Sequence, residues 1–155
     1  MLEDDGFVPI GRITLAGGKF VVHFDRPEAR SWGPVIYAFR IGGEVVRISK
    51  GESDLASAIR GWERNVSDAL RGIFHLGGTN PWEALELRSR LTEHRYGEFL
   101  ARRGATGEKK ALIKRYDPVL CNDSPCAKLR PPEARSVKNV ALAVTYWGRL
   151  NRVLI

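Results

Sequence analysis

A glutamate stands on an otherwise basic segment near residue 110, and a proline and an asparagine follow it. Glu108, Leu112 and Tyr116 are four residues apart, so on a helix the carboxylate shares a row with side chains that favour the interior. Burying a carboxylate is costly unless a metal ion, a base or hydrogen-bond donors hold it. Glu108 is therefore a candidate metal ligand. The alternative is a glutamate in the first turn of a helix, where the helix dipole favours it.

Positive charge is concentrated in the second half of the chain. The 155 residues carry a formal net charge of +7; residues 1–87 have 10 Lys/Arg and 12 Asp/Glu, and residues 88–155 have 15 and 6. This asymmetry predicts a surface for a polyanion such as nucleic acid. The candidate contacts nearest Glu108 are Arg102, Arg103, Lys109, Lys110, Lys114 and Arg115, and a further set could extend them: Lys128, Arg130, Arg135 and Lys138.

The composition also restricts compartment and cysteine chemistry. No apolar run approaches the roughly 20 residues that span a bilayer, and the acidic start lacks the features of a signal peptide. We expect a cytoplasmic protein with no membrane partner. Cys121 and Cys126 have no histidines at metal-site spacing, so we expect reduced thiols and no zinc site.

The first 50 residues read as two hairpins. Glycine pairs suited to tight turns separate the runs within each hairpin, and the runs cover residues 12–15, 20–24, 35–41 and 44–48. Apolar residues at helical spacing then predict four helices. The first extends from a cap at Ser53 or Asp54 to about residue 73, and the second from a cap at Asn80, in Asn80-Pro81-Trp82-Glu83, to about Arg103. The third runs from Glu108 to just before Pro118, and the fourth over 137–147. The pattern predicts an α+β fold, a small antiparallel sheet flanked by helices, in one domain over 1–155.

The order of these residues resembles the GIY-YIG nuclease superfamily. Val35-Ile36-Tyr37 stands at the first motif, and Arg47-Ile48-Ser49 stands at the second after nine intervening residues. The resemblance covers roughly residues 34–123, and the flanking segments would be additions. The departures are Val35 and Ser49 in place of the motif glycines and Arg47 in place of the motif tyrosine. The remaining matches are Lys50, Arg60, Glu108 and Asn122.

The resemblance implies a GIY-YIG-like endonuclease that hydrolyses DNA with Mg²⁺ or Mn²⁺. Glu108 would hold the ion, which neutralises charge on the phosphoryl and leaving oxygens. Arg60 would bind the scissile phosphate, and Tyr37 would act as base or position the attacking water. Lys50 would favour the ionised form of that hydroxyl, and Asn122 would support the site by hydrogen bonding.

Arg47 leaves two interpretations open. It supplies a second phosphate contact, or it marks a catalytically inactive nucleic-acid-binding protein of the same fold. A third interpretation is a small basic interaction protein with an accidental resemblance. If the chain cleaves both strands, it needs two active sites or turnover between the strands, and a homodimer would provide the former.

Overall fold

The computed structural model describes residues 1–153, and its centre is a five-stranded antiparallel sheet with the order β2-β1-β5-β3-β4. The α+β class expected from the sequence is confirmed. The strands are β1 (Val8–Ala16), β2 (Lys19–Phe24), β3 (Val35–Ile41), β4 (Glu44–Gly51) and β5 (Gly97–Arg103).

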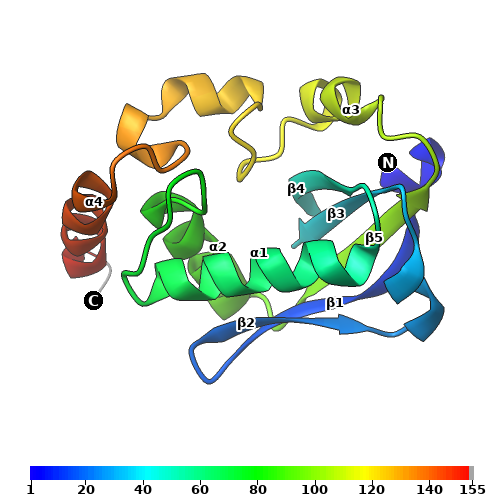
Figure 1. Cartoon of the computed structure of the whole chain (residues 1–155), viewed down its shortest axis with the longest axis horizontal. Helices are drawn as coiled ribbons and strands as arrows, with labels where there is room; N and C mark the ends of the chain where they lie inside the picture. Colours follow the sequence, from blue (N-terminus) through cyan, green and yellow to red (C-terminus); the bar gives the residue numbers. More distant parts are fainter. Residues whose placement is uncertain (154–155) are drawn as a thin grey trace.

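Four helices accompany the sheet (Figure 1). They are α1 (Leu55–Leu70), α2 (Pro81–Glu93), α3 (Lys109–Tyr116) and α4 (Val140–Val153). Short 3-10 turns add η1 (Leu2–Asp5), η2 (Pro27–Ser31), η3 (Pro125–Leu129) and η4 (Pro132–Ala134). Within residues 1–153, no helix combines the length and the apolar character needed to cross a bilayer.

The β3–β4 hairpin turns at Gly42 and Gly43, whose φ angles of 59° and 80° suit a residue without a side chain. Its register places Tyr37 opposite Ser49 and Phe39 opposite Arg47. Directly opposed residues of antiparallel strands lie on the same face of the sheet. The two motif segments therefore direct Tyr37 and Arg47 toward one side.

The expectation of one long helix from Asn80 to Arg103 is wrong. Helix α2 ends at Glu93, and β5 lies between β1 and β3 at the centre of the sheet. Phe99, Leu100 and Ala101 are all fully buried because both faces of the sheet are covered. A strand buried on both faces lacks the apolar–polar alternation that identifies strands in sequence.

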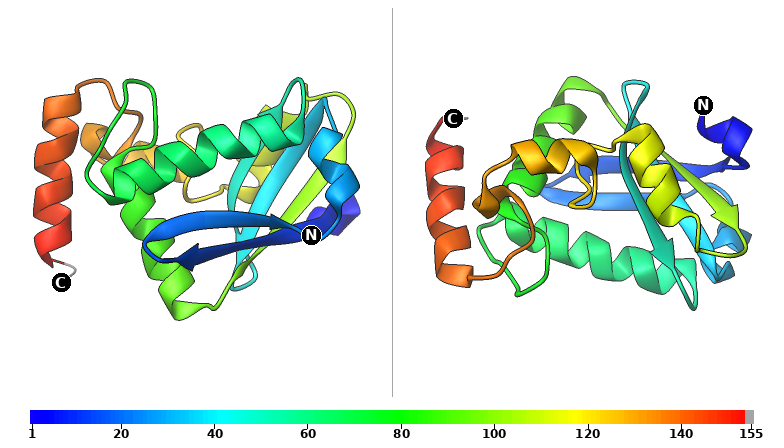
Figure 2. Two further views of the ribbon diagram at one scale, coloured as in Figure 1. Left: turned by 60° about the horizontal axis from the view of Figure 1, so that its bottom comes forward. Right: turned by 90° about the horizontal axis from the view of Figure 1, so that it is seen from above.

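Different helices cover the two faces of the sheet. Tyr37, Phe39 and Phe99 belong to the core beneath α1 and α2. Ile36 and Leu100 belong to a second core, which α3 completes with Leu112 and Ile113. Helix α4 lies beyond α2 at one end of the molecule (Figure 2), and its Asn151 accepts a hydrogen bond from Arg88 of α2 at 3.3 Å.

Other elements form hydrogen bonds with both edge strands of the sheet, β2 and β4. Glu63 on α1 accepts from the backbone N–H of Val22 in β2 at 2.8 Å. At the other edge, the backbone N–H of Leu120 donates to Val46 of β4 at 2.8 Å, and Ile48 donates to the Cys121 sulfur at 3.2 Å. These contacts protect the edges from pairing with other chains.

Candidate active site

A polar hollow of about 410 Å³, here called the Glu83 hollow, opens between the β3–β4 hairpin, α1 and the start of α2. The hairpin contributes Tyr37, Arg47 and Lys50, and α2 contributes Glu83. Asn122 reaches the hollow from the segment after α3. Four of the six residues predicted as catalytic therefore line one cavity: Tyr37, Arg47, Lys50 and Asn122.

Glu83 and Arg47 form an ion pair at the base of this hollow. The Arg47 Nη1 donates to Glu83 Oε1 at 3.0 Å, and the two side chains are 19% and 5% exposed. The Arg47 guanidinium also lies 5.5 Å from the centre of the Trp62 ring. Burial raises the pKa of Glu83 above its ordinary value, although Arg47 and Arg130 act in the opposite direction. A buried carboxylate that borders a cavity can bind a cation or a proton there.

Tyr37 borders the hollow from a rigid position. Its ring packs edge-on against Phe39 and Phe99, with centroid distances of 5.8 and 6.0 Å. Burial alone would lower the pKa of Arg47, but the neighbouring Tyr37 and Glu83 outweigh it, and the net pKa is raised. Tyr37 therefore lies close to the Arg47 guanidinium.

Lys50 and Asn122 are exposed residues of the same hollow. Lys50 pairs with Glu52 at 2.8 Å. Asn122 is held near β4 because its neighbour Cys121 bonds to the backbone of Ile48 in both directions, at 3.2 and 3.3 Å. Cys121 and Cys126 are both free.

Arg60 lies on the other flank of α1. It lines a separate hollow along β2 and donates from Nη2 to the Ser57 hydroxyl at 3.2 Å. Ser57 itself lines the Glu83 hollow. The guanidinium is therefore beside the candidate site and outside its lining.

Glu108 lies on the opposite face of the sheet from Tyr37. It precedes α3, its side chain is 70% exposed, and its Oε2 pairs with Arg102 at 2.9 Å. On the helical row of Glu108, Leu112 and Tyr116, Leu112 is buried and Tyr116 is half-buried, as predicted. Glu108 itself points to solvent. Glu108 does not line the Glu83 hollow.

Glu83 is the residue that the sequence interpretation missed. The Asn80-Pro81-Trp82-Glu83 segment indicated a helix cap, and Asn80 Oδ1 does accept from the Glu83 backbone N–H at 2.8 Å. The signal was a second row: Glu83, Leu87 and Leu91 are four residues apart, and both leucines are buried. The spacing that made Glu108 a candidate metal ligand therefore makes Glu83 one as well.

The predicted basic cluster is divided between several roles. Arg102 donates to the Asp5 carbonyl at 3.1 Å, and Arg115 pairs with the Asp5 carboxylate, so both hold η1 in place. Arg103 lies over the Trp32 ring at 5.2 Å. Lys110 lines a hollow of about 370 Å³ that shares Asn122 with the Glu83 hollow. The other members on α3 are Lys109 and Lys114.

The donor set of the Glu83 hollow suits Mg²⁺ in one of its usual binding modes. No group of three His, Cys, Asp or Glu side chains able to hold a metal occurs within residues 1–153. Mg²⁺ is commonly held by one or two carboxylates, with waters and substrate phosphates completing its octahedron. Glu83 supplies one carboxylate, and Asn122 and Thr79 bring further oxygens to the same cavity.

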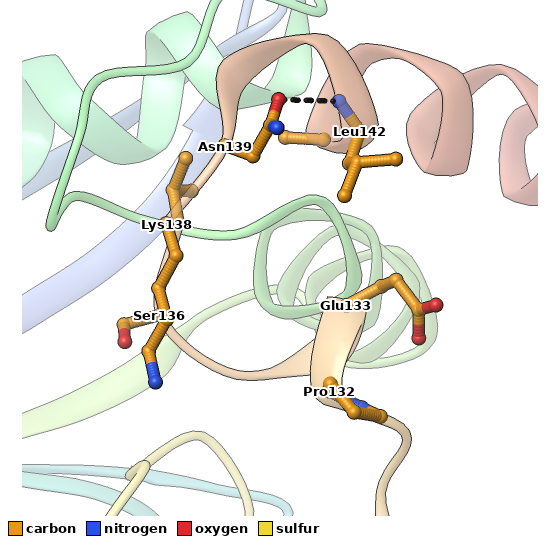
Figure 3. Close-up of a pocket in the computed structure, with 8 residues that line it drawn as sticks. Pro132, Glu133, Ser136, Lys138, Asn139 and Leu142 are labelled. Atoms are coloured by element: carbon orange, nitrogen blue, oxygen red, sulfur yellow. Dashed lines mark hydrogen bonds between the residues drawn. The ribbon is translucent and has the colours of Figure 1, made fainter.

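A second hollow, of about 250 Å³, lies between η4 and the start of α4 (Figure 3). Glu133 and Lys138 stand on either side of it, and Asn139 Oδ1 accepts from the Leu142 N–H at 3.2 Å. Its lining is mainly apolar and holds none of the predicted catalytic residues. The Glu83 hollow is therefore the better candidate for polar chemistry.

The fold and the hollow together define an α+β protein with a polar cavity over a hairpin of its antiparallel sheet. This fold is shared with a mutant of bacteriophage T4 EndoII, at a TM-score of 0.52 and 20% identity, over 76% of this chain and 92% of that one. The restriction endonuclease HPY188I in complex with product DNA is also similar, at a TM-score of 0.48 and 12% identity. The similar region covers 66% of this chain and 58% of the HPY188I chain. No protein-family model matches the sequence, and no curated protein matches it significantly.

Proposed function

We propose that this chain is a Mg²⁺-dependent endonuclease that hydrolyses DNA, with the Glu83 hollow as its active site. The observation that carries the proposal is the convergence of Tyr37, Arg47, Lys50 and Asn122 around a buried carboxylate. The resemblance to GIY-YIG nucleases singled out those four residues from the sequence. The fold shared with T4 EndoII is consistent with it.

Glu83 takes the metal-binding role in this proposal. Glu108 faces solvent on the other side of the sheet, so an ion held there would be remote from Tyr37. A Mg²⁺ ion bound by Glu83 would neutralise charge that develops on the phosphoryl oxygens and the leaving oxygen. Asn122 would contribute an oxygen or hold a bound water.

The other residues act on the phosphate and the attacking water. The Tyr37 hydroxyl, fixed by its aromatic neighbours, would orient the water or accept its proton. Arg47 donates one N–H to Glu83 and could offer others to a phosphate oxygen. Lys50 would attract the substrate at the rim of the hollow. Arg60 would contact a neighbouring phosphate from the flank of α1.

The DNA track would continue past Asn122. Lys110 and Lys128 line the adjoining hollow with Asn122, so their ammonium groups could neutralise the next phosphates. Lys109 and Lys114 would add charge from the same helix. If one chain cuts one strand, a homodimer would supply the second active site.

The Arg47–Glu83 pair also supports the alternative function, nucleic-acid binding without cleavage. A carboxylate already neutralised by a guanidinium attracts a metal ion less strongly than a free one. A protein of that kind would retain the basic surface and would bind DNA without hydrolysing it.

Nicking of supercoiled plasmid in Mg²⁺ tests the proposal. The wild type should nick, and Glu83→Gln should lose at least about 100-fold in rate, which corresponds to about 2.7 kcal/mol of transition-state stabilisation. The matched control, Glu108→Gln, should stay within about twofold. If Glu108→Gln abolished nicking and Glu83→Gln did not, Glu108 would be the ligand. Binding without nicking in either Mg²⁺ or Mn²⁺ would favour the alternative.

A further inference from the structure

Helix α1 separates two hollows. The Glu83 hollow lies on the flank facing the β3–β4 hairpin. A larger hollow of about 660 Å³, here called the β2 hollow, lies on the flank facing β2. In Figure 1, α1 crosses the front of the molecule with β3 and β4 above it and β1 and β2 below it. The helix therefore forms a ridge with a depression on each side.

The crest of this ridge is polar and exposed. Ser57, Arg60 and Arg64 are three and four residues apart, so they follow one line along the helix. The opposite side of α1 is buried through Ile59 and Trp62. The crest is free of large side chains at Gly61, where an added Cβ would have no neighbour within 4 Å.

Most of the positively charged side chains in the β2 hollow have no ion-pair partner among residues 1–153. Lys19, Arg60 and Arg64 form no ion pair among residues 1–153, whereas Arg71 is paired with Asp68. The Glu63 carboxylate is held by the backbone N–H of Val22. Cations without partners beside a groove are the pattern that phosphate backbones select.

We propose that α1 enters the major groove of duplex DNA, with one strand's backbone in the Glu83 hollow and the other strand's backbone along the β2 hollow. This inference rests on the proposed function and names its substrate class. An α-helix with its side chains is about 10–12 Å across, and the major groove of B-DNA is about 12 Å wide. The deep, narrow major groove of A-form RNA excludes such a ridge. Duplex DNA is the ligand, and single strands and duplex RNA are not.

Equilibrium binding by fluorescence anisotropy tests this geometry. The measurement uses a Glu83→Gln background to prevent cleavage and three probes of one sequence: duplex DNA, single-stranded DNA and duplex RNA. Adding Lys19→Ala and Arg64→Ala should weaken duplex DNA binding at least about tenfold and reduce the slope of log affinity against log salt by about 1.8, or about 0.9 for each lost phosphate contact. Single-stranded DNA binding should change by less than about twofold.

A matched control replaces two exposed arginines away from the ridge, Arg95→Ala and Arg152→Ala, and should bind duplex DNA like its parent. Lys19 and Arg64 are exposed, so the thermal melt of the double variant should match that of its parent. The proposal is overturned if the Lys19 and Arg64 changes affect single and double strands equally or affect neither. It is also overturned if duplex RNA binds as tightly as duplex DNA.

The outcomes separate this inference from the proposed function. If the Glu83-intact protein never nicks DNA but the Lys19 and Arg64 changes selectively weaken duplex binding, the docking geometry stands and the catalytic proposal fails. If protein with those two changes nicks plasmid as fast as the wild type under dilute conditions and keeps duplex affinity, catalysis stands and the docking geometry fails.

Discussion

Burial sets the pKa of Glu83, because it outweighs the opposing charges of the Arg47 and Arg130 guanidinium groups. Its side chain is 5% exposed, and desolvation dominates the charge of Arg47, so its pKa is raised. A folded-state pKa above the unfolded value means that the native state binds the proton more tightly. The resulting stabilisation is complete below the ordinary pKa of about 4.5 and is lost as pH rises through the folded pKa.

Glu83→Gln should therefore change how stability depends on pH. The free energy of unfolding of the wild type, relative to that of Glu83→Gln, should fall as pH rises from about 4 to 7. Denaturant unfolding of both proteins across that range measures the difference. A difference that stays constant or grows with pH would show that folding does not raise the pKa of Glu83.

Cys126 should react slowly with alkylating agents. Burial and a hydrogen bond with Asp117 raise its pKa to about 11, so at pH 8 it holds about 100-fold less thiolate than a thiol at 9.0. Asp117→Asn should speed alkylation, and asparagine tolerates the left-handed backbone at this position. Mass spectrometry can follow the rate of iodoacetamide labelling at Cys126 in the wild type and in Asp117→Asn. Labelling of the wild type as fast as a free cysteine would contradict the assignment.

Strand β5 depends on a glycine at its start. A Cβ added to Gly97 would lie 2.7 Å from both Ile13 and Ile41, in neighbouring strands. Such a contact forces the sheet or the side chains to move.

Gly97→Ala should destabilise the protein by about 1–3 kcal/mol, the usual cost of overpacking a core. Gly107→Ala is the matched control, because a Cβ there meets nothing within 4 Å. Chemical denaturation of both variants gives the comparison. Equal stabilities would mean that β1, β3 and β5 pack less closely than the structure shows.

The local signals in the sequence were sufficient for the β3–β4 hairpin and the caps of α1 and α2. Each depends on a few adjacent residues, such as Gly42-Gly43 or the Asp54 side chain that accepts from Ser57 at 2.8 Å. Strand β5 and the role of Glu83 depend on distant partners. No residue near Glu83 in the sequence indicates that it pairs with Arg47. The two are 36 residues apart and meet only when the sheet and α2 pack together.

The sheet separates two sets of charges in the molecule. Arg102 and Arg115 hold η1 on the α3 face, while Arg47, Lys50 and the cations of the α1 ridge serve the opposite face. The sequence shows the net excess of positive charge, but only the fold shows which cations remain available to a polyanion.

Duplex DNA binding should weaken steeply with salt. The five contacts of Arg47, Lys50, Lys19, Arg60 and Arg64 alone predict a loss of roughly 500-fold in affinity between 50 and 200 mM monovalent salt, and contacts from the lysines past Asn122 would increase that loss. Anisotropy titrations at several salt concentrations give the slope. A loss of less than about tenfold would mean that fewer than two of these contacts form.

If a divalent ion binds at Glu83, anomalous X-ray scattering from Mn²⁺ soaked into crystals will locate it there. We expect one anomalous peak within coordination distance of the Glu83 carboxylate, inside the hollow that Tyr37 and Asn122 border, and its loss in Glu83→Gln crystals. A peak at Glu108 with none at Glu83, or Mn²⁺ density that persists in the Glu83→Gln variant, would show that Glu83 is not the metal ligand.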